Sequence, residues 1–228
     1  MKSDRRKATL FGVLLILSIL FGILNSVPAI EKPDYLTKLA TIRIEILIAV
    51  FFQAAMAITY TIITVLMYPI LRQYNESLAI SYFGFRIIGS AFLFAGIATL
   101  LLLLFLSQSL VLSGQTNSPV FLTIGELLRT GRDLINHVGM ILPWSTGGLI
   151  LYYCFFKMNL VPKWLSIWGI VSSSLTLLST LMLMLHFIQI LTATYLIMNT
   201  PTVLFEIFLA FFLIFKGFNP NAVMKNKV

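Results

Sequence analysis

Two charged residues interrupt long apolar stretches of this sequence and are its first candidates for chemistry. Arg86 stands within "SYFGFRIIGSAFLFAGIATLLLLLFL", and Glu206 stands within "TVLFEIFLAFFLIF". A carboxylate in apolar surroundings can hold a proton, bind a cation or accept hydrogen bonds from a ligand, and a guanidinium can pair with it. Whether any of these roles applies depends on the elements that position the two side chains.

The composition places those elements in a membrane. Of the 228 residues, 59% are hydrophobic and only 11% are charged, and the mean hydropathy is +0.96. Apolar runs of about 20 residues, long enough to cross a bilayer, recur along the chain. The sequence therefore predicts a multi-pass membrane protein whose first partner is the lipid bilayer. The net charge of +8 does not indicate nucleic acid, because the basic residues flank the apolar runs.

The hydropathy pattern predicts an all-α polytopic membrane protein, a six-transmembrane-helix bundle forming a single integral membrane domain over residues 1–228. The expected spans cover about 8–27, 44–68, 80–107, 133–156, 164–186 and 196–215. The stretch from Pro119 to Phe156 is too long for one span, because its 38 residues would cover about 57 Å of helix against a hydrocarbon core of about 30 Å. We therefore expect a break near Gly131, with a short outer amphipathic helix before the fourth span. Pro69 is expected to follow the second span, and Pro143 to kink the fourth.

Six spans place both termini on one side, and the basic residues indicate which side. Ten of the 16 Lys and Arg residues flank the spans on the side of the termini, and five flank the opposite side. Because cytoplasmic loops are enriched in Lys and Arg, we expect both termini in the cytoplasm and the chain in the bacterial cytoplasmic membrane. The apolar run from Ala8 to Val27 is longer than the core of a signal peptide, about 7–15 residues, so we expect a retained helix.

The two charged candidates, Glu206 and Arg86, are expected at different depths in the membrane. Glu206 lies ten residues before Lys216, which places it about 15 Å from the inner boundary and close to the midplane. Three interpretations of Glu206 stay open: a neutral hydrogen-bonded structural group, a proton or cation carrier, and a ligand contact. Arg86 lies about 12 Å from the start of its apolar run. It either extends to the inner interface alone or forms an ion pair with Glu206.

Neutral polar residues extend this candidate site. Gln53 and Tyr60 share one face of the second span, and either could partner Glu206. Glu206, Arg86, Gln53 and Tyr60 are therefore the candidate intramembrane polar or ion-pair site. On the fifth span, small and hydroxylated residues recur on one face, which favours close helix packing, with a polar path as the alternative.

A second candidate is an outer-interface polar cluster of Asp133, His137 and Glu45. Each lies about 30 Å or more from an inner boundary marker when counted along a helix. All three are therefore expected at the outer interface, where a charge is less costly than at mid-bilayer.

Known catalytic and metal-binding signatures are absent from the sequence. HExxH, GxSxG and Walker A motifs do not occur, and no His, Cys and carboxylate residues have metal-ligand spacing. His137 and His186 lie at similar depth and could in principle ligate a haem, but scattered interfacial histidines are the commoner arrangement. The lone Cys154 excludes an intramolecular disulfide and indicates apolar packing. We expect no catalytic residue, no metal and no cofactor.

Four segments of the chain resemble a known family. They are "KPDYLTKLA", "YPILRQYNESLAISYFGFR", "LILYYCFFKMNLVPKWLSIWG" and "FEIFLAFFLIFKGFNPNA". Together they resemble the bacterial multi-pass membrane family known as domain of unknown function 4386, over nearly the whole chain. The resemblance implies an integral membrane protein and supplies no catalytic residues. It also implies that members often have an arginine where Arg86 stands, an acid where Glu206 stands, and an acid where this chain has Gln53.

Two functions follow as expectations. The first is a non-enzymatic structural, regulatory or interaction role, in which a partner helix or a second copy of the chain packs against the bundle. The alternative is a small-solute or ion transporter or channel that uses the midplane Glu206 and a polar helix face. An intramembrane enzyme acting on lipid is a third hypothesis and would need a second reactive group beside Glu206. No particular small-molecule ligand is indicated.

Overall fold

The computed structural model describes residues 2–114 and 118–220, and every regular element in that part of the chain is helical. The elements are α1 (Lys2–Leu24), η1 (Pro28–Glu31), α2 (Tyr35–Thr41), α3 (Arg43–Arg72), α4 (Glu76–Ser113), α5 (Pro119–Leu134), η2 (Ile135–Met140), α6 (Ile141–Met158), α7 (Lys163–Met184) and α8 (Ala193–Phe215). The predicted all-α class is confirmed.

Six helices of the described chain are long and apolar enough to cross a membrane. They are Arg5–Leu24 within α1, then α3, α4, the continuous stretch Pro119–Met158, α7 and α8. The chain is therefore a multi-pass membrane protein, and its spans place large apolar side chains against the lipid bilayer.

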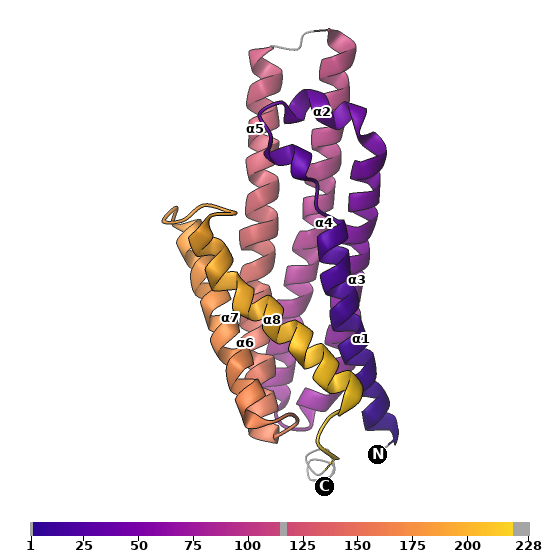
Figure 1. Cartoon of the computed structure of the whole chain (residues 1–228), viewed down its shortest axis with the longest axis vertical. Coiled ribbons are helices and arrows are strands. Elements are labelled where there is room, and N and C mark those ends of the chain that lie inside the picture. The colour runs from indigo at the N-terminus through magenta and orange to yellow at the C-terminus, as the bar shows by residue number, and fades with distance from the viewer. Residues whose placement is uncertain (1, 115–117, 221–228) are drawn as a thin grey trace.

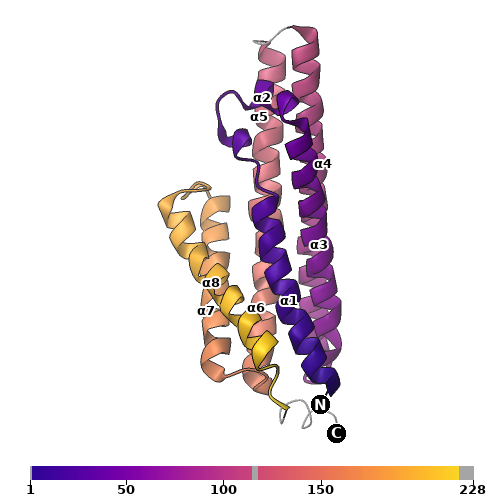
Figure 2. The ribbon, with the colours of Figure 1, turned by 45° about the vertical axis from the view of Figure 1, so that its right-hand side comes forward.

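The helices form a tall bundle with a shorter hairpin on one side. In Figure 1, α4 and the stretch from α5 to α6 rise through the full height, α3 reaches up to the level of α2, and the α7–α8 hairpin ends lower. Helix α8 runs obliquely, from the upper end of α7 to the lower end of α1, and it packs against both. Figure 2 shows the same oblique path from a second side, with α2 lying across the upper part of the bundle. Helix α1 begins and α8 ends at the same end of the bundle.

Two apolar cores lie at different heights. The larger core joins α1, α3, α4, α6, α7 and α8 around fully buried rings such as Tyr82, Tyr152 and Phe155. A second core joins η1, α2, α3 and α4 around Ile30, Leu39 and Leu100. A small apolar cluster of Met56, Ala57 and Leu93 forms between them. Tyr60, one of the polar residues singled out from the sequence, packs against this cluster.

The irregularity in the long fourth helix is displaced from the position expected from the sequence. Helix α5 occupies the predicted outer amphipathic segment, but the chain passes through Gly131 without a break. A π-helical turn, η2, follows instead and leads directly into α6. Pro143 lies three residues after η2 and has no N–H to donate to the carbonyl of Gly139. The backbone hydrogen bonds of the preceding helical turn must therefore rearrange. The irregularity thus accommodates Pro143, the residue expected to kink this span.

The second span also continues further than expected. Pro69 lies inside α3, which ends at Arg72 rather than at Tyr68. A proline so close to the helix end removes one hydrogen bond where the chain is about to leave the membrane, so the helix tolerates it. Helix α1 ends at Leu24, three residues before the predicted boundary, because η1 turns the chain toward α2.

Candidate functional site

Arg86 lies in the interior of the bundle, where aromatic rings surround its guanidinium. Only 4% of the residue is exposed. The guanidinium carbon lies 4.4 Å from the centre of the Trp144 ring and 5.7 Å from the centre of the Tyr82 ring. A guanidinium over an aromatic face gains cation–π stabilisation, most strongly over tryptophan. Arg86 is therefore held by stacking inside the protein.

Two glycines of α6 make room for this arginine. A Cβ added to Gly147 would lie 3.1 Å from Cγ of Arg86, and one added to Gly148 would lie 3.4 Å from its Nη2. The same position at Gly148 is 3.0 Å from Oγ of Ser173 on α7. The glycine pair thus allows the arginine to pass along α6 and to approach the hydroxylated face of α7.

Glu206 lies on α8 and is also buried, with 5% of the residue exposed. It lines a cavity of about 350 Å³ bounded by α1, α3, α6, α7 and α8. Among the described residues that line this cavity, Glu206 is the only acidic or basic one. The other polar lining residues are neutral: Ser18, Tyr60, Thr176, Tyr195, Asn199 and Thr202. We call this space the Glu206 cavity.

Arg86 and Glu206 occupy one electrostatic environment without touching. Among the described ion pairs, none joins them with a nitrogen–oxygen distance of 4.0 Å or less. Both nevertheless lie near Tyr152: a Cβ added to Gly148 would lie 3.4 Å from Nη2 of Arg86 and 3.6 Å from Cε2 of Tyr152, and the Tyr152 ring packs against Phe205, which precedes Glu206. Trp144 lines the Glu206 cavity and carries Arg86 stacked on its ring, while Arg86 itself does not line the cavity. The indole therefore separates the guanidinium from the cavity.

Tyr60 is the neutral candidate that the fold brings to Glu206. It lines the same cavity, and its ring centre lies 5.9 Å from that of Trp144. Gln53, seven residues earlier on α3, lies elsewhere. Its Nε2 donates to the Leu93 carbonyl at 2.9 Å and to Oδ1 of Asn136 at 3.2 Å.

The Gln53–Asn136 pair marks a second, smaller cavity of about 250 Å³. A side chain at Gly96 would collide with both amides, so this glycine allows them to meet. The second cavity shares Gly22, Met56, Met140 and Ile141 with the Glu206 cavity and is also lined by Arg132 and His137. Two adjoining cavities thus extend from Glu206 toward the end of the bundle at which α2 lies.

The predicted outer cluster of Asp133, His137 and Glu45 is only partly brought together. Asp133 lies 3.3 Å from Nη1 of Arg132, and Nδ1 of His137 lies 2.8 Å from the Tyr195 hydroxyl. Glu45 is exposed in the first turn of α3. Among the described residues, no hydrogen bond or ion pair joins Glu45 to the other two.

Nearby, outside the spans, Tyr35 of α2 lies under Arg129, whose guanidinium carbon is 5.1 Å from the ring centre. Burial, followed by the Glu126 carboxylate, raises the pKa of the Tyr35 phenol above its ordinary value. The phenol consequently stays neutral at physiological pH and continues to serve as a cation–π partner for Arg129.

The small face of α7 joins that helix to α8 through hydroxyl groups. Oγ1 of Thr176 and Oγ1 of Thr202 lie 2.6 Å apart, and the Thr202 hydroxyl donates to the Ser172 carbonyl at 3.0 Å. Nδ2 of Asn199 donates to Oγ of Ser179 at 3.0 Å. This face therefore packs the two helices closely, and Thr176 at the same time contributes a hydroxyl to the Glu206 cavity.

Several buried polar atoms around Arg86 and Glu206 have no hydrogen-bond partner among the described residues. They are the Tyr82 hydroxyl, Nε of Arg86, Nε1 of Trp144, Oγ of Ser173 and Oε1 of Glu206. An unpartnered buried polar atom destabilises a fold, by about 1–3 kcal/mol, unless a functional role or a bound molecule accounts for it. Their concentration in one region distinguishes it from the rest of the interior.

Sequence reasoning identified the two charges but not the residues that define their surroundings. Tyr82, Trp144 and Tyr152 enclose Arg86, and Asn136 pairs with Gln53. The adjacent glycines Gly147 and Gly148 were the available signal, because two glycines in a transmembrane helix indicate close approach by a neighbour. Across residues 2–114 and 118–220, no group of three His, Cys, Asp or Glu side chains is arranged to hold a metal ion.

Comparison with known families bears on the same residues. A family model described as "Domain of unknown function (DUF4386)" matches residues 10–217. The chain belongs to the DUF4386 family. The match includes Arg86, Glu206 and all the residues that line the Glu206 cavity. No curated protein and no solved structure matches the chain. The DUF4386 assignment thus agrees with the membrane fold, and any function must be argued from the site.

Proposed function

We propose that this DUF4386 protein binds a small cationic solute inside the membrane at Glu206, as part of its transport across the cytoplasmic membrane of a bacterium. The observation that supports this proposal is that Glu206, the deepest charge counted from the sequence, lines a cavity and keeps one oxygen unpartnered. A buried carboxylate with an available acceptor favours a cation or a hydrogen-bond donor. Neutral hydroxyl and amide groups in the same wall could orient the solute.

The shape of the interior supports access from one end only. The smaller cavity around Gln53 and Asn136 adjoins the Glu206 cavity and leads toward the end expected to lie outside. Toward the other end, Tyr152 packs against Phe205 with ring centres 4.7 Å apart and against Phe155 at 6.1 Å. These rings belong to the larger apolar core. This arrangement corresponds to an outward-facing state with both termini in the cytoplasm.

The position of Arg86 is compatible with cation binding at Glu206. Its guanidinium stacks on the Trp144 ring, which lines the Glu206 cavity, whereas Arg86 itself does not line that cavity. A bound cation would then meet the carboxylate directly while the guanidinium stays outside the binding space. Arg86 is accordingly a positioning residue that sets the electrostatic environment of Glu206.

A structural or interaction role is the second candidate, and a different observation favours it. Helix α4 has 38 residues and would extend about 57 Å, well beyond a hydrocarbon core of about 30 Å. Large apolar residues on the upper parts of α4 and α5 are exposed, among them Leu112, Val120 and Leu127. Surfaces of this kind favour helix–helix association with a partner or a second copy of the chain.

A ligand-stabilisation experiment tests the proposed function. The purified full-length chain is heated with methylammonium, tetramethylammonium or guanidinium chloride, with NaCl at equal ionic strength as the reference. We expect at least one organic cation to raise the melting temperature of the wild type, because a ligand that binds only the folded state stabilises it by mass action. Glu206→Gln should weaken the apparent affinity at least about tenfold, equivalent to about 1.4 kcal/mol. Uptake of the same cation into proteoliposomes then measures transport.

The matched control is Glu45→Gln, which removes an exposed carboxylate outside the cavity. This variant should respond to the cation like the wild type. If no probe stabilises the wild type, or if Glu206→Gln responds equally well, the solute-binding proposal is wrong and the structural role becomes the better account.

A further inference from the structure

The oblique course of α8 creates a second crevice on the side opposite the Glu206 cavity. Near its C-terminal end, α8 faces the beginning of α7, and two adjoining cavities of about 310 and 340 Å³ lie there. They share Pro162, Phe212 and Lys216. We call this pair of cavities the α7–α8 crevice. It contains none of the residues assigned to solute binding.

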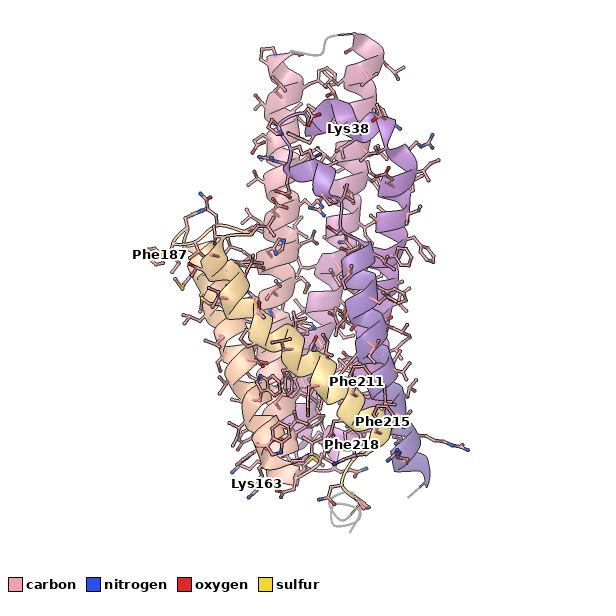
Figure 3. The ribbon with its side chains drawn as sticks, in the orientation of Figure 1. Lys38, Lys163, Phe187, Phe211, Phe215 and Phe218 are labelled. Atoms are coloured by element: carbon pink, nitrogen blue, oxygen red, sulfur yellow. The ribbon has the colours of Figure 1, made fainter. Side chains whose placement is uncertain are left out.

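One part of the crevice is aromatic. Trp164 of α7 lies across from Phe208 of α8, with ring centres 5.5 Å apart. Phe211 and Phe215 continue the surface along α8 with nearly parallel rings, 9° between planes. Figure 3 shows Phe211 and Phe215 following one another along the lower part of α8, with Phe218 beyond its end. An exposed apolar surface of this kind within a spanning helix faces lipid chains.

The other part of the crevice is cationic. Lys163 and Lys216 both line the lower cavity, and Lys216 also lines the aromatic one. Their ammonium nitrogens lie 5.7 and 5.9 Å from the ring centres of Phe156 and Phe212. Within the described chain, neither lysine has a carboxylate within 4.0 Å. Two positive charges are therefore available where the aromatic surface ends.

Neighbouring contacts leave these lysines free to bind an anion. Arg5 donates to the carbonyls of Ile214 and Phe215, so the end of α8 already has a cationic cap. The backbone N–H groups of Lys163 and Trp164 lie in the first turn of α7, where helix geometry provides no intrahelical acceptor. Such N–H groups, at the positive end of the helix dipole, favour phosphate.

The chain after α8 closes the crevice from below. Gly217 adopts a left-handed conformation with φ of 76°, which turns the chain back toward the α6–α7 connection. The Asn219 N–H then donates to the Leu160 carbonyl at 2.9 Å, and the Phe218 ring packs at 5.9 Å against Phe155. The floor of the crevice is thus attached to the larger apolar core.

We propose that the α7–α8 crevice binds an anionic phospholipid from the surrounding bilayer. The phosphate lies between Lys163 and Lys216 at the first turn of α7, and an acyl chain follows Trp164, Phe208 and Phe211. The two lysines favour an anionic headgroup because of their positive charge. The cationic and aromatic cavities adjoin, so the ligand should carry both a phosphate and an apolar chain. A free phosphate has no group for the aromatic half.

Native mass spectrometry of the full chain with defined lipids tests this site. Phosphatidylglycerol is titrated against phosphatidylcholine of the same chain length for the wild type, Lys163→Gln, Lys216→Gln and the double variant. Each exposed lysine should contribute about fivefold to apparent phosphatidylglycerol affinity, and the double variant should lose the preference over phosphatidylcholine. Lys157→Gln is the matched control, because Lys157 is an exposed lysine near the same end of the bundle that does not line the crevice.

The possible results distinguish a specific lipid site from general attraction to basic residues and from binding of the phosphate group alone. Retention of full affinity by Lys157→Gln, with no competition from water-soluble glycerol phosphate, supports a lipid site. An equal loss in Lys157→Gln would show attraction to basic residues in general and would overturn the proposal. Competition by glycerol phosphate at the same concentration as the lipid would overturn it as well. Circular dichroism of each variant confirms that a loss of binding does not reflect unfolding.

Discussion

At the scale of single residues, Trp144 holds the Arg86 guanidinium in place by stacking. The sequence left two alternatives, an arginine that extends alone to the interface and one paired with Glu206. In the structure the guanidinium stacks on Trp144, 4.4 Å from the ring centre, and makes no direct ion pair with the glutamate. Trp144 also lines the Glu206 cavity, so both charged residues lie beside the same ring. Coupling between them therefore passes through a shared low-dielectric environment rather than through a contact.

A double-mutant cycle measures that coupling. Arg86→Met keeps much of the aliphatic stem and removes the charge, and Glu206→Gln keeps the shape of the carboxylate. We expect each variant alone to lower the free energy of unfolding, and the double variant to lose less than the sum by at least about 0.5 kcal/mol. Unfolding of the purified protein in detergent provides the measurement. Arg86→Met combined with Glu45→Gln should be additive, and additivity in the Glu206 cycle would show that the two charges are independent.

At the scale of elements, glycines decide how closely the helices approach. Gly169 of α7 faces two aromatic rings: an added Cβ would lie 2.6 Å from Cζ of Phe205 and 2.7 Å from Cγ of Tyr152. Gly131 of α5 has no heavy atom of a neighbouring residue within 4 Å of the same position. The identical substitution should therefore have opposite effects at the two sites.

We expect Gly169→Ala to destabilise the protein by about 1–3 kcal/mol, because rigid rings cannot yield without moving α6 or α8. Gly131→Ala should be neutral or stabilise by up to about 1 kcal/mol, because alanine has the higher helix propensity and α5 is continuous through this position. Thermal unfolding of both variants checks the pair. Strong destabilisation by Gly131→Ala would contradict the continuous helix, and a neutral Gly169→Ala would contradict the close packing.

At the scale of the whole molecule, the oblique course of α8 produces both the Glu206 cavity and the α7–α8 crevice. Helix α8 meets α1 at one end and α7 at the other, so it forms an angle with each (Figure 1). The angle with α1 holds the Glu206 cavity, and the angle with α7 holds the aromatic and cationic crevice. The two sites lie at opposite parts of one helix, so α8 is the element through which they could influence one another.

Access to the Glu206 cavity from each side of the membrane can be measured with single cysteines. Ile19→Cys places a thiol on the wall of the Glu206 cavity, whereas Leu20→Cys places one on the exposed face of α1 outside it. In intact cells a membrane-impermeant cationic thiol reagent should modify position 19 and leave position 20 unreacted, because a thiol in lipid does not ionise. Inside-out vesicles should show little modification at either position. Labelling from the cytoplasmic side alone would reverse the proposed orientation, and equal labelling of both positions would exclude a distinct cavity. The unsubstituted chain, in which Cys154 is buried, gives the background.

The sequence by itself determined the class of the protein, because the length and hydropathy of its apolar runs leave only membrane-spanning helices as a stable structure. It also predicts a position near the midplane for Glu206, since depth can be counted along a helix. It did not locate the irregularity of the fourth span. The sequence offers both Gly131 and Pro143, twelve residues apart, as places where the helix could deform, and the π-helical turn lies between them.

Only the tertiary structure decided which polar residues meet. Tyr60 and Gln53 share a face of α3, yet Tyr60 lines the Glu206 cavity while Gln53 pairs with Asn136. A helix face specifies direction but not the neighbour found there, and the neighbour depends on how far adjacent helices separate along their length. The departure of α8 from the bundle axis, which no local pattern encodes, opens the cavity at Glu206 and the crevice at Lys216.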